Sequence, residues 1–346
     1  MKILIVRLGA LGDIVHAIPV AVALRSRFPE AQIDWVVSAV HSEILDLVPA
    51  LNRRIILNDR ANAVGGLSLR AAIAELRRNR YDVAIDLQGL IKSAIIARLS
   101  GARRVVGFNA RYARESLACW FYTDVHDPGG EGLYAPSETR HVVTINLGVL
   151  AALGVSPGPA EFRIDAVASP DVSRVIEQAH GKFVLLNTGA AWPNKRWPAP
   201  RLAELAVRLH ERRAVASIVL WGPGERALAE RVVTMSNGAA LLAPQTTIAD
   251  VAALASAAAV MVSGDTGPTH IASAMGTPIV GIYGPTRPER NGPLGPDDEV
   301  VSRASVCACH HLRECRLERM CLLDIDVAEV LEAVERRLAA AEQRRG

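Results

Sequence analysis

The strongest chemical signal in the sequence is the stretch SGDTGPTH (263–270), which follows an apolar run typical of a buried strand. Gly267 permits a tight turn there, and Pro268 suits the first position of a following helix. The backbone N–H groups of Thr266 and Gly267 would then lie at a helix N-terminus, where phosphate binds readily. The spacing therefore predicts a phosphate site at Asp265, Thr266 and Gly267.

A purely structural interpretation makes Asp265 and Thr266 simple caps of that helix. Caps would explain the turn, but they would not explain His270, which we expect to point from the first helical turn into the same site. His270 alone could equally be a histidine of the core, so its own role stays open.

Two other loops that follow apolar runs carry charged residues. The loop after NTGA (187–190) brings Lys195 ahead of a predicted helix. A lysine beside the phosphate site would neutralise a departing diphosphate, as a metal ion does in some transferases, but an exposed loop cation is as plausible on local grounds. The loop WGPGE (221–225) places Glu225 where it could bind ribose hydroxyls or cap a helix.

Near the start of the chain, the pattern G-x-x-G-D ends at Asp13, after the apolar run KILIVRL (2–8). This spacing lacks the third glycine and the ribose-binding acid of a dinucleotide fingerprint. Asp13 could cap a helix starting at Ile14, and spacing alone favours that interpretation. A carboxylate at the end of a first strand could instead accept a proton from an acceptor hydroxyl.

Two patterns resemble metal sites. Asp324 and Asp326 have the D-x-D spacing of some glycosyltransferases, but Asp326 is better explained as a helix N-cap and Asp324 follows no strand. A second pattern is the spacing C-x-C-x5-C-x5-C, which is not a standard zinc spacing, so we favour a reduced, packed loop over a zinc or iron–sulfur site. Its members are Cys307, Cys309, Cys315 and Cys321. We therefore expect no metal and no cofactor.

Strands that alternate with helices must position these residues. Half of the 346 residues are apolar but only 4% are aromatic, which suits buried parallel strands covered by helices. Apolar runs predict strands at 2–8, 33–37, 54–57, 82–87, 104–108, 183–190, 217–222, 259–264 and 277–284. Amphipathic stretches predict helices at 14–28, 67–80, 141–153, 200–213 and 247–257, a short helix ending at 275, and a last helix at 326–345. This alternation predicts two Rossmann-like, doubly wound parallel sheets with the active site in a central cleft.

Charge and hydropathy narrow the partners and the location. Residues 52–114 hold 13 basic and 4 acidic side chains, which would attract phosphates, carboxylates or an anionic membrane face. Solvated helix faces account for some of these arginines, and few aromatic side chains are present to stack on bases, so no nucleic acid partner is expected. No apolar stretch approaches the ~20 residues of a membrane span, and the first residues lack a signal-peptide cleavage site. We expect a cytoplasmic protein that is at most peripheral on the membrane.

Several stretches taken together resemble the lipopolysaccharide heptosyltransferases, glycosyltransferase family nine, and among them heptosyltransferase I. The resemblance covers nearly the whole chain. It is carried by KILIVRLGALGDIVHAIP, IDWVV, YDVAIDLQGLIKSA (81–94), ARESLACWFY (113–122), NKRWP, WGPGE, VSGDTGPTHIASAMGTP and YGPTRP (283–288).

The resemblance implies a GT-B fold and an inverting, metal-independent transfer of heptose from ADP-heptose to the Kdo region of lipid A, at the inner face of the cytoplasmic membrane, in lipopolysaccharide inner-core synthesis. It implies an N-terminal acceptor-binding domain at 1–160 and a C-terminal nucleotide-sugar-binding domain at 161–325, separated within a Pro- and Gly-rich segment. The helix at 326–346 could pack back towards the first domain.

The resemblance also assigns roles to single residues. Asp13 would be the general base, and Lys195 with Thr188 would hold the diphosphate. Glu225 would contact the ribose and Thr246 the adenine. Asp265, Thr266, Gly267 and His270 would complete the donor site. The residues that match acceptor-facing positions are Arg60, Lys92, Arg114 and His141.

Two departures keep other functions in view. The loop NTGAAWPNKRW is longer than in heptosyltransferase I, and the cysteine-rich segment is similar to heptosyltransferase II and the wider family. A heptosyltransferase II-like enzyme, or one with another sugar or acceptor, is therefore the first alternative. A nucleotide-sugar epimerase of the same architecture and a non-catalytic glycolipid-binding protein are more distant ones.

Overall fold

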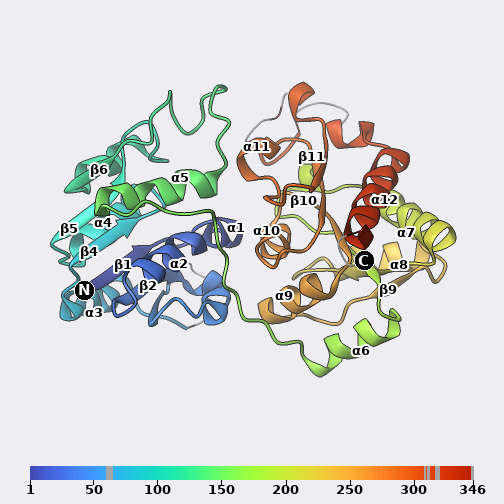
Figure 1. Cartoon of the computed structure of the whole chain (residues 1–346), viewed down its shortest axis with the longest axis horizontal. Helices are drawn as coiled ribbons and strands as arrows, with labels where there is room; N and C mark the ends of the chain where they lie inside the picture. Colours follow the sequence, from blue (N-terminus) through green and yellow to red (C-terminus); the bar gives the residue numbers. More distant parts are fainter. Residues whose placement is uncertain (60–64, 308, 310–311, 316–319, 344–346) are drawn as a thin grey trace. The chain divides into compact units, whose positions relative to one another are not determined.

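The computed structural model describes residues 1–59, 65–307, 309, 312–315 and 320–343. The chain forms two compact units, Met1–Asp165 and Ala166–Gly346. The division falls inside the Pro- and Gly-rich segment at which the sequence predicts a boundary. Figure 1 colours the chain along its sequence, so the first unit runs from blue to green and the second from green to red.

The first unit is built on a six-stranded parallel sheet with the order β3-β2-β1-β4-β5-β6. Its strands are β1 (Lys2–Val6), β2 (Gln32–Ser38), β3 (Arg53–Leu57), β4 (Val83–Asp86), β5 (Arg104–Phe108) and β6 (Asp124–His126). Ile3 of β1 is paired with Ile33 of β2 on one side and with Val83 of β4 on the other. The strand order therefore reverses beside β1, and in such sheets ligands bind at the carboxyl ends of the strands near this reversal.

The second unit repeats this plan with the order β12-β11-β10-β7-β8-β9. Its strands are β7 (Phe183–Asn187), β8 (Ala216–Leu220), β9 (Ala240–Leu242), β10 (Val260–Gly264), β11 (Ile279–Tyr283) and β12 (Glu299–Ser302). All the pairs are parallel, and the order reverses between β7 and β10. The two doubly wound parallel sheets confirm the predicted α/β fold class.

The helices of the first unit differ from the prediction at one point. They are α1 (Leu11–Val15), α2 (Ile18–Arg27), α3 (Leu69–Asn79), α4 (Ile91–Leu99) and α5 (Val142–Gly148), with 3-10 helices η1 (Ala39–Leu47), η2 (Ser116–Phe121) and η3 (Val149–Leu153). The single helix predicted at 14–28 is wrong, because α1 and α2 are separate helices. Pro19 lies in the first turn of α2, where its missing N–H costs nothing, whereas inside one continuous helix it would clash with the carbonyl of Val15.

The second unit includes the last helix of the chain. Its helices are α6 (Pro170–Gln178), α7 (Ala199–Arg213), α8 (Arg226–Met235), α9 (Ile248–Ala257), α10 (Gly267–Ala274), α11 (Pro288–Asn291) and α12 (Val327–Gln343), with 3-10 helices η4 (Pro193–Lys195), η5 (Ala304–Val306) and η6 (Cys321–Asp324). Helix α12 packs against α7 and against β10–β12. Figure 1 shows α12 next to α7. A buried ion pair joins Arg337 of α12 to Asp298, with Nη2 and Oδ1 3.1 Å apart.

Several elements were not predicted. The strands among them, β6, β9 and β12, have only three or four residues and lie towards the edges of the sheets, where little of a strand is buried. The α-helices among them are α4, α6, α8 and the four-residue α11. Asp326 lies where the predicted N-cap requires it, because its Oδ1 accepts a hydrogen bond from Glu329 N at 2.9 Å. Within the described part of the chain, no helix has the length and apolar character to cross a membrane.

Candidate active site

The predicted phosphate site lies at the junction of β10 and α10. Helix α10 begins at Gly267. Thr266 occupies the N-cap position, but its side chain makes no capping hydrogen bond to the helix. The Thr266 hydroxyl instead accepts a hydrogen bond from Asn187 Nδ2 at 3.0 Å and lies 3.1 Å from Thr269 Oγ1. Because the Thr266 side chain does not cap the helix, the N-terminal N–H groups of α10 are available to an anion, and the helix dipole favours negative charge there.

Asp265 holds two basic side chains beside this helix terminus. Its Oδ2 lies 2.6 Å from Lys195 Nζ, and its Oδ1 lies 3.1 Å from His270 Nε2. Burial alone would raise the pKa of the Asp265 carboxyl, but His270 and then Lys195 more than offset it, so the pKa lies far below its ordinary value. Asp265 is therefore ionised, and it keeps a lysine next to an open helix N-terminus.

The backbone around Lys195 is also closely fitted. The ammonium lies 4.3 Å from the centre of the Trp192 ring, within range of a cation–π contact. The neighbouring Asn194 is buried and donates to Leu312 O at 2.9 Å. A Cβ added to Gly264 would lie 2.7 Å from Lys195 O, so only glycine lets the end of β10 approach this loop. These contacts fix the position of the lysine relative to Asp265.

Glu225 lies against the loop after β7. It is the N-cap residue of α8 but makes no side-chain cap; its Oε2 instead accepts a hydrogen bond from Gly222 N at 2.9 Å. Its Oε1 lies 3.7 Å from Arg196 Nη2. A Cβ on Gly189 would lie only 1.8 Å from Glu225 Oε2. Of the two roles left open by the sequence, direct capping of the helix is therefore not what this side chain does.

The structure gives Thr188 and Thr246 less distinctive surroundings. Thr188 is buried, and its hydroxyl donates to Leu220 O at 3.2 Å, so in this structure it is engaged by the backbone of β8. Thr246 is half-buried and directly precedes Thr247, which caps α9 through a reciprocal pair with Asp250. Contacts of Thr188 with a diphosphate and of Thr246 with adenine stay predictions.

The candidate base, Asp13, lies at the end of β1 in the first unit, on the first turn of α1. Three donors reach its Oδ2 atom: Arg7 Nη2 at 2.9 Å, Ala10 N at 3.2 Å and Arg114 Nη1 at 3.3 Å. Burial would raise the pKa of the Asp13 carboxyl, but the charge of Arg7, followed by that of Arg114 and the Ala10 N–H, brings it below its ordinary value. Asp13 thus caps the first turn of α1 through Ala10 N, and it is an ionised carboxylate held by Arg7 and Arg114.

Arg7 is a functional candidate that the sequence did not predict. It is buried, and its Nη1 donates to Leu87 O at the end of β4. A cation that directly follows the apolar residues ILIV (3–6) is the signal that could have identified it, because a buried arginine requires a partner.

The other predicted acceptor residues follow different strands of the same sheet. Lys92, at the start of α4, pairs with Asp59 at an Nζ–Oδ2 distance of 2.8 Å. His141 is the N-cap residue of α5: its Nδ1 accepts from Val143 N at 3.2 Å, and its ring meets that of His16 edge to face. The structure thus brings Arg114, but neither Lys92 nor His141, into direct contact with Asp13. Arg60 lies outside the described residues.

The four cysteines of the C-terminal segment form no disulfide and lie close to one another. The sulfur atoms of Cys309 and Cys315 are 3.3 Å apart. Burial, followed by a hydrogen bond with Cys307, raises the pKa of the Cys321 thiol above its ordinary value. In the part of the chain that the structure describes, no three His, Cys, Asp or Glu side chains are arranged to hold a metal ion.

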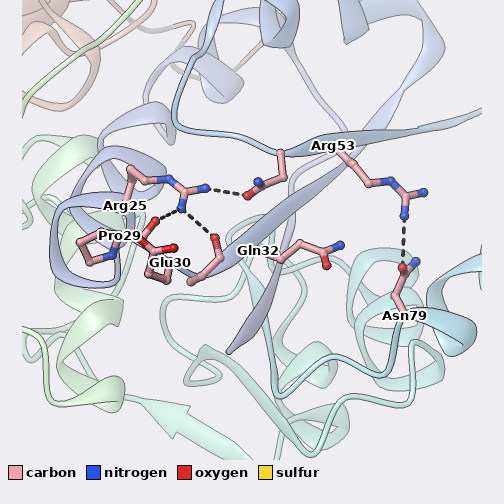
Figure 2. Close-up of a pocket in the computed structure, with 8 residues that line it drawn as sticks. Arg25, Pro29, Glu30, Gln32, Arg53 and Asn79 are labelled. Atoms are coloured by element: carbon pink, nitrogen blue, oxygen red, sulfur yellow. Dashed lines mark hydrogen bonds between the residues drawn. The ribbon is translucent and has the colours of Figure 1, made fainter.

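A pocket of about 500 Å³ lies at the opposite edge of the first sheet, where β2 and β3 begin (Figure 2). Its two arginines are used within the fold: Arg25 donates to Ala50 O, Pro29 O, Ala31 O and Asn52 Oδ1, and Arg53 to Glu75 and Asn79. The remaining lining residues are Glu30 and Gln32. With its cations already paired, this pocket is a structural feature and not a second anion site.

Comparison with known proteins identifies the family. The family described as glycosyltransferase family 9 (heptosyltransferase) matches residues 69–321. Lipopolysaccharide heptosyltransferase 1 of Pseudomonas aeruginosa is 31% identical over 301 residues, which span 85% of this chain and 82% of that protein. Structures of an E. coli heptosyltransferase have been solved with ADP and with ADP-2-deoxy-2-fluoro heptose. Each has a TM-score of 0.73 and 23% identity to this chain; the alignments cover 99% and 97% of this chain, respectively, and 99% of that protein.

This similarity confirms the GT-B fold expected from the sequence. A family match over most of the chain, together with a relative at 31% identity, leads to one conclusion. The chain belongs to glycosyltransferase family 9, the heptosyltransferase family, and is a glycosyltransferase.

Proposed function

We propose that this enzyme transfers heptose from ADP-heptose, with inversion and without a metal, to the Kdo region of lipid A during synthesis of the lipopolysaccharide inner core. The observation that carries the proposal is the Lys195–Asp265 pair beside the uncapped N-terminus of α10. A cation and open backbone N–H groups together suit the diphosphate of a nucleotide sugar. The E. coli relative solved with ADP and a heptose analogue supports this choice of donor.

In the reaction that we propose, Asp13 accepts the proton of an acceptor hydroxyl while that oxygen attacks the anomeric carbon of the heptose. The bond from this carbon to the phosphate oxygen breaks, and ADP leaves with the electron pair. Lys195 and the N–H groups of α10 stabilise the negative charge that develops on the diphosphate. Because Asp265 already balances Lys195, binding the diphosphate requires the lysine to share its hydrogen bonds with the ligand.

On the acceptor side, Lys92, Arg114 and His141 would bind an anionic glycolipid. All three follow strands of the first unit at the carboxyl ends, the edge that carries Asp13. Kdo carries a carboxylate and lipid A carries phosphates, both of which pair well with arginine and lysine. Arg60 would join this group.

The acceptor lies in a membrane, so we propose that the first unit docks on its cytoplasmic face. In the 3-10 helix η2, Trp120 is 81% exposed to solvent and Leu117 is 50% exposed, which is unusual for apolar residues of this size. Arg111 precedes this helix, and its side chain is 61% exposed. Tryptophan and basic side chains favour the membrane–water interface, the former through its ring and the latter through anionic headgroups.

A matrix of donors and acceptors tests the proposal. Nucleotide release is measured with ADP-heptose or UDP-sugars, with and without Kdo-lipid A, in the presence and absence of EDTA. We expect release only from ADP-heptose with Kdo-lipid A, unaffected by EDTA. An acceptor that already carries one heptose would be preferred if the enzyme is heptosyltransferase II-like, and this result would overturn the proposed acceptor.

Two outcomes of the same matrix would favour other functions. Conversion of the donor without any acceptor indicates an epimerase. Glycolipid binding that survives Lys195→Ala, with no turnover by the wild type under any condition, indicates a non-catalytic binding protein.

A further inference from the structure

The carboxylate of Asp13 is held from one side only. Arg7, Ala10 and Arg114 all donate to Oδ2, whereas Oδ1 receives no hydrogen bond from any described residue. The Asp13 side chain is 31% exposed, so Oδ1 remains open to solvent or to a ligand. A carboxylate with one fixed oxygen and one free oxygen is suited to accept a proton in a single direction.

Arg7 supplies the shortest of these contacts and is itself anchored. Its side chain is 6% exposed. One amino group, Nη1, donates to Leu87 O at the end of β4, and the other, Nη2, reaches Asp13. Its backbone N–H donates to Val36 O and its carbonyl accepts from Trp35 Nε1 at 3.0 Å, which ties the residue to β2. The guanidinium is therefore fixed between the central strands and transmits their position to Asp13.

The burial of Arg7 is costly for the fold. Its Nε is buried and makes no hydrogen bond within the described part of the chain, although buried donors are almost always paired. Burial and then the positive charge of Arg114 lower the pKa of Arg7. A buried cation that leaves one donor unpaired and repels a second arginine gives little stability. Its position is better explained by what it does to Asp13.

We propose that Arg7 is a positioning residue for sugar transfer, which holds Asp13 by Oδ2 and leaves Oδ1 to take the proton of the acceptor. This inference rests on the proposed role of Asp13 as the base. Arg7 acts through Asp13 and touches neither the donor nor the acceptor.

The charge of Arg7 also affects the pH range in which Asp13 can act. The groups that surround this site are Arg7, Arg114 with its neighbour Tyr134, Asp86 of β4, and His41 of η1, which lies against Gly9. Burial would raise the pKa of Asp13, and Arg7 is the largest opposing influence. Without that charge, the pKa of Asp13 should rise. A base with a raised pKa becomes protonated at higher pH, so activity should fall on the acid side.

The test compares the pH dependence of transfer for wild type, Arg7→Gln, Arg7→Lys and Asp13→Asn from about pH 5 to about pH 9. We expect Arg7→Gln to lower kcat on the order of 10²-fold, because a misplaced catalytic group has an effect of this size, and to leave the donor KM unchanged. Its rate should fall further towards acid pH, where the wild-type profile stays flat. Arg7→Lys should keep the wild-type profile, because the charge remains, but lower kcat about tenfold, since an ammonium does not reproduce the two-armed contact.

Arg25→Gln is the matched control. Arg25 lies in the same unit and also donates to backbone carbonyls (Figure 2). It lies near the beginning of β2 and β3, whereas Arg7 and Asp13 follow the carboxyl end of β1. The Arg25→Gln variant should lower the melting temperature without moving the pH profile.

The variants distinguish the role of Asp13 as the base from the role of Arg7 as its positioning residue. If Asp13→Asn retains transfer, the proposed base is wrong, whatever Arg7 does. If Asp13→Asn is inactive while Arg7→Gln keeps both rate and pH profile, only the role of Arg7 is overturned. Should Arg7→Gln fail to fold, an Arg7→Lys enzyme with wild-type kcat would overturn it instead.

Discussion

Lys195 and Asp265, 70 residues apart in the chain, meet at 2.6 Å beside the first turn of α10. The carboxylate holds the ammonium at the place where a diphosphate would bind, and it is itself kept ionised by His270 and Lys195. Without the nucleotide, the charges of Lys195 and Asp265 therefore neutralise each other. A nucleotide that enters gains the lysine and the helix N-terminus together.

Removal of this cation should affect the leaving group more than the fold. We expect Lys195→Ala to lower kcat/KM for ADP-heptose by about 10²–10³-fold, the usual loss when one charge-stabilising donor is removed. ADP affinity, measured by calorimetry, should fall in the same variant. Lys182→Ala, which changes a lysine just before β7, is the control and should leave both quantities unchanged. Equal losses in the two variants would contradict a specific role for Lys195.

Gly189 provides a steric test of Glu225. Because an added Cβ would lie 1.8 Å from Glu225 Oε2, Gly189→Ala must displace the carboxylate or the loop. We expect a roughly tenfold or larger rise in the donor KM, comparable to the cost of overpacking a buried site. Gly158→Ala is the control, because nothing lies within 4 Å of its added Cβ. An unchanged KM in Gly189→Ala would argue against contact between Glu225 and the ribose.

Much of the fold could be predicted because the strands that build it are long apolar runs. Strands such as β1, β7 and β10 are buried on both faces, so their composition identifies them without any tertiary information. Short edge strands such as β6, with the sequence DVH, are held by their neighbours and carry no such pattern. The break between α1 and α2 was not predicted because the nearly continuous apolar stretch IVHAIPVAVAL (14–24) runs through Pro19.

The candidate site was predictable only in part, for a related reason. The turn after β10 can be inferred locally, since its glycine and proline specify a strand-to-helix junction. The contacts of Asp13 cannot, because Arg114 is 101 residues away and meets it only when β1 and the loop after β5 lie at one edge of the sheet. Arg7 looked like part of a strand, and its role depends on Leu87 and Asp13 being beside it.

Glu138 makes a pH-dependent contribution to the stability of the first unit. It accepts hydrogen bonds from Arg140 N at 3.0 Å and Arg140 Nε at 2.8 Å, and from the Tyr112 hydroxyl. The Arg140 hydrogen bonds, opposed by burial and aided by Tyr112, lower the pKa of Glu138 from 4.5 to about 2. A carboxyl group whose pKa is lowered by folding stabilises the fold at any pH above its pKa in the unfolded chain. For Glu138, this stabilisation is lost as the pH falls from 4.5 to about 2.

Glu138→Gln should therefore lower the urea midpoint at neutral pH, and the difference from wild type should shrink as the pH drops through that window. Glu131→Gln, an exposed glutamate nearby in the sequence that accepts from Ser137, should change the midpoint little at any pH. A difference between Glu138→Gln and wild type that is constant with pH would mean that the carboxylate charge is not the cause.

Trp120 tests the proposed membrane surface. Because its ring is 81% exposed on η2, Trp120→Ser removes apolar area without opening a cavity, and the fold should be unaffected. Binding to vesicles that contain anionic lipid should weaken several-fold, and tryptophan fluorescence of the wild type should shift to the blue on binding, since the ring enters the interface. Val167→Ser is the control, because Val167 is 79% exposed in the other unit. Equal vesicle binding by Trp120→Ser and wild type would remove η2 from the docking surface. Transfer to a short, water-soluble acceptor should be the same in both proteins, because Trp120 has no part in the proposed chemistry.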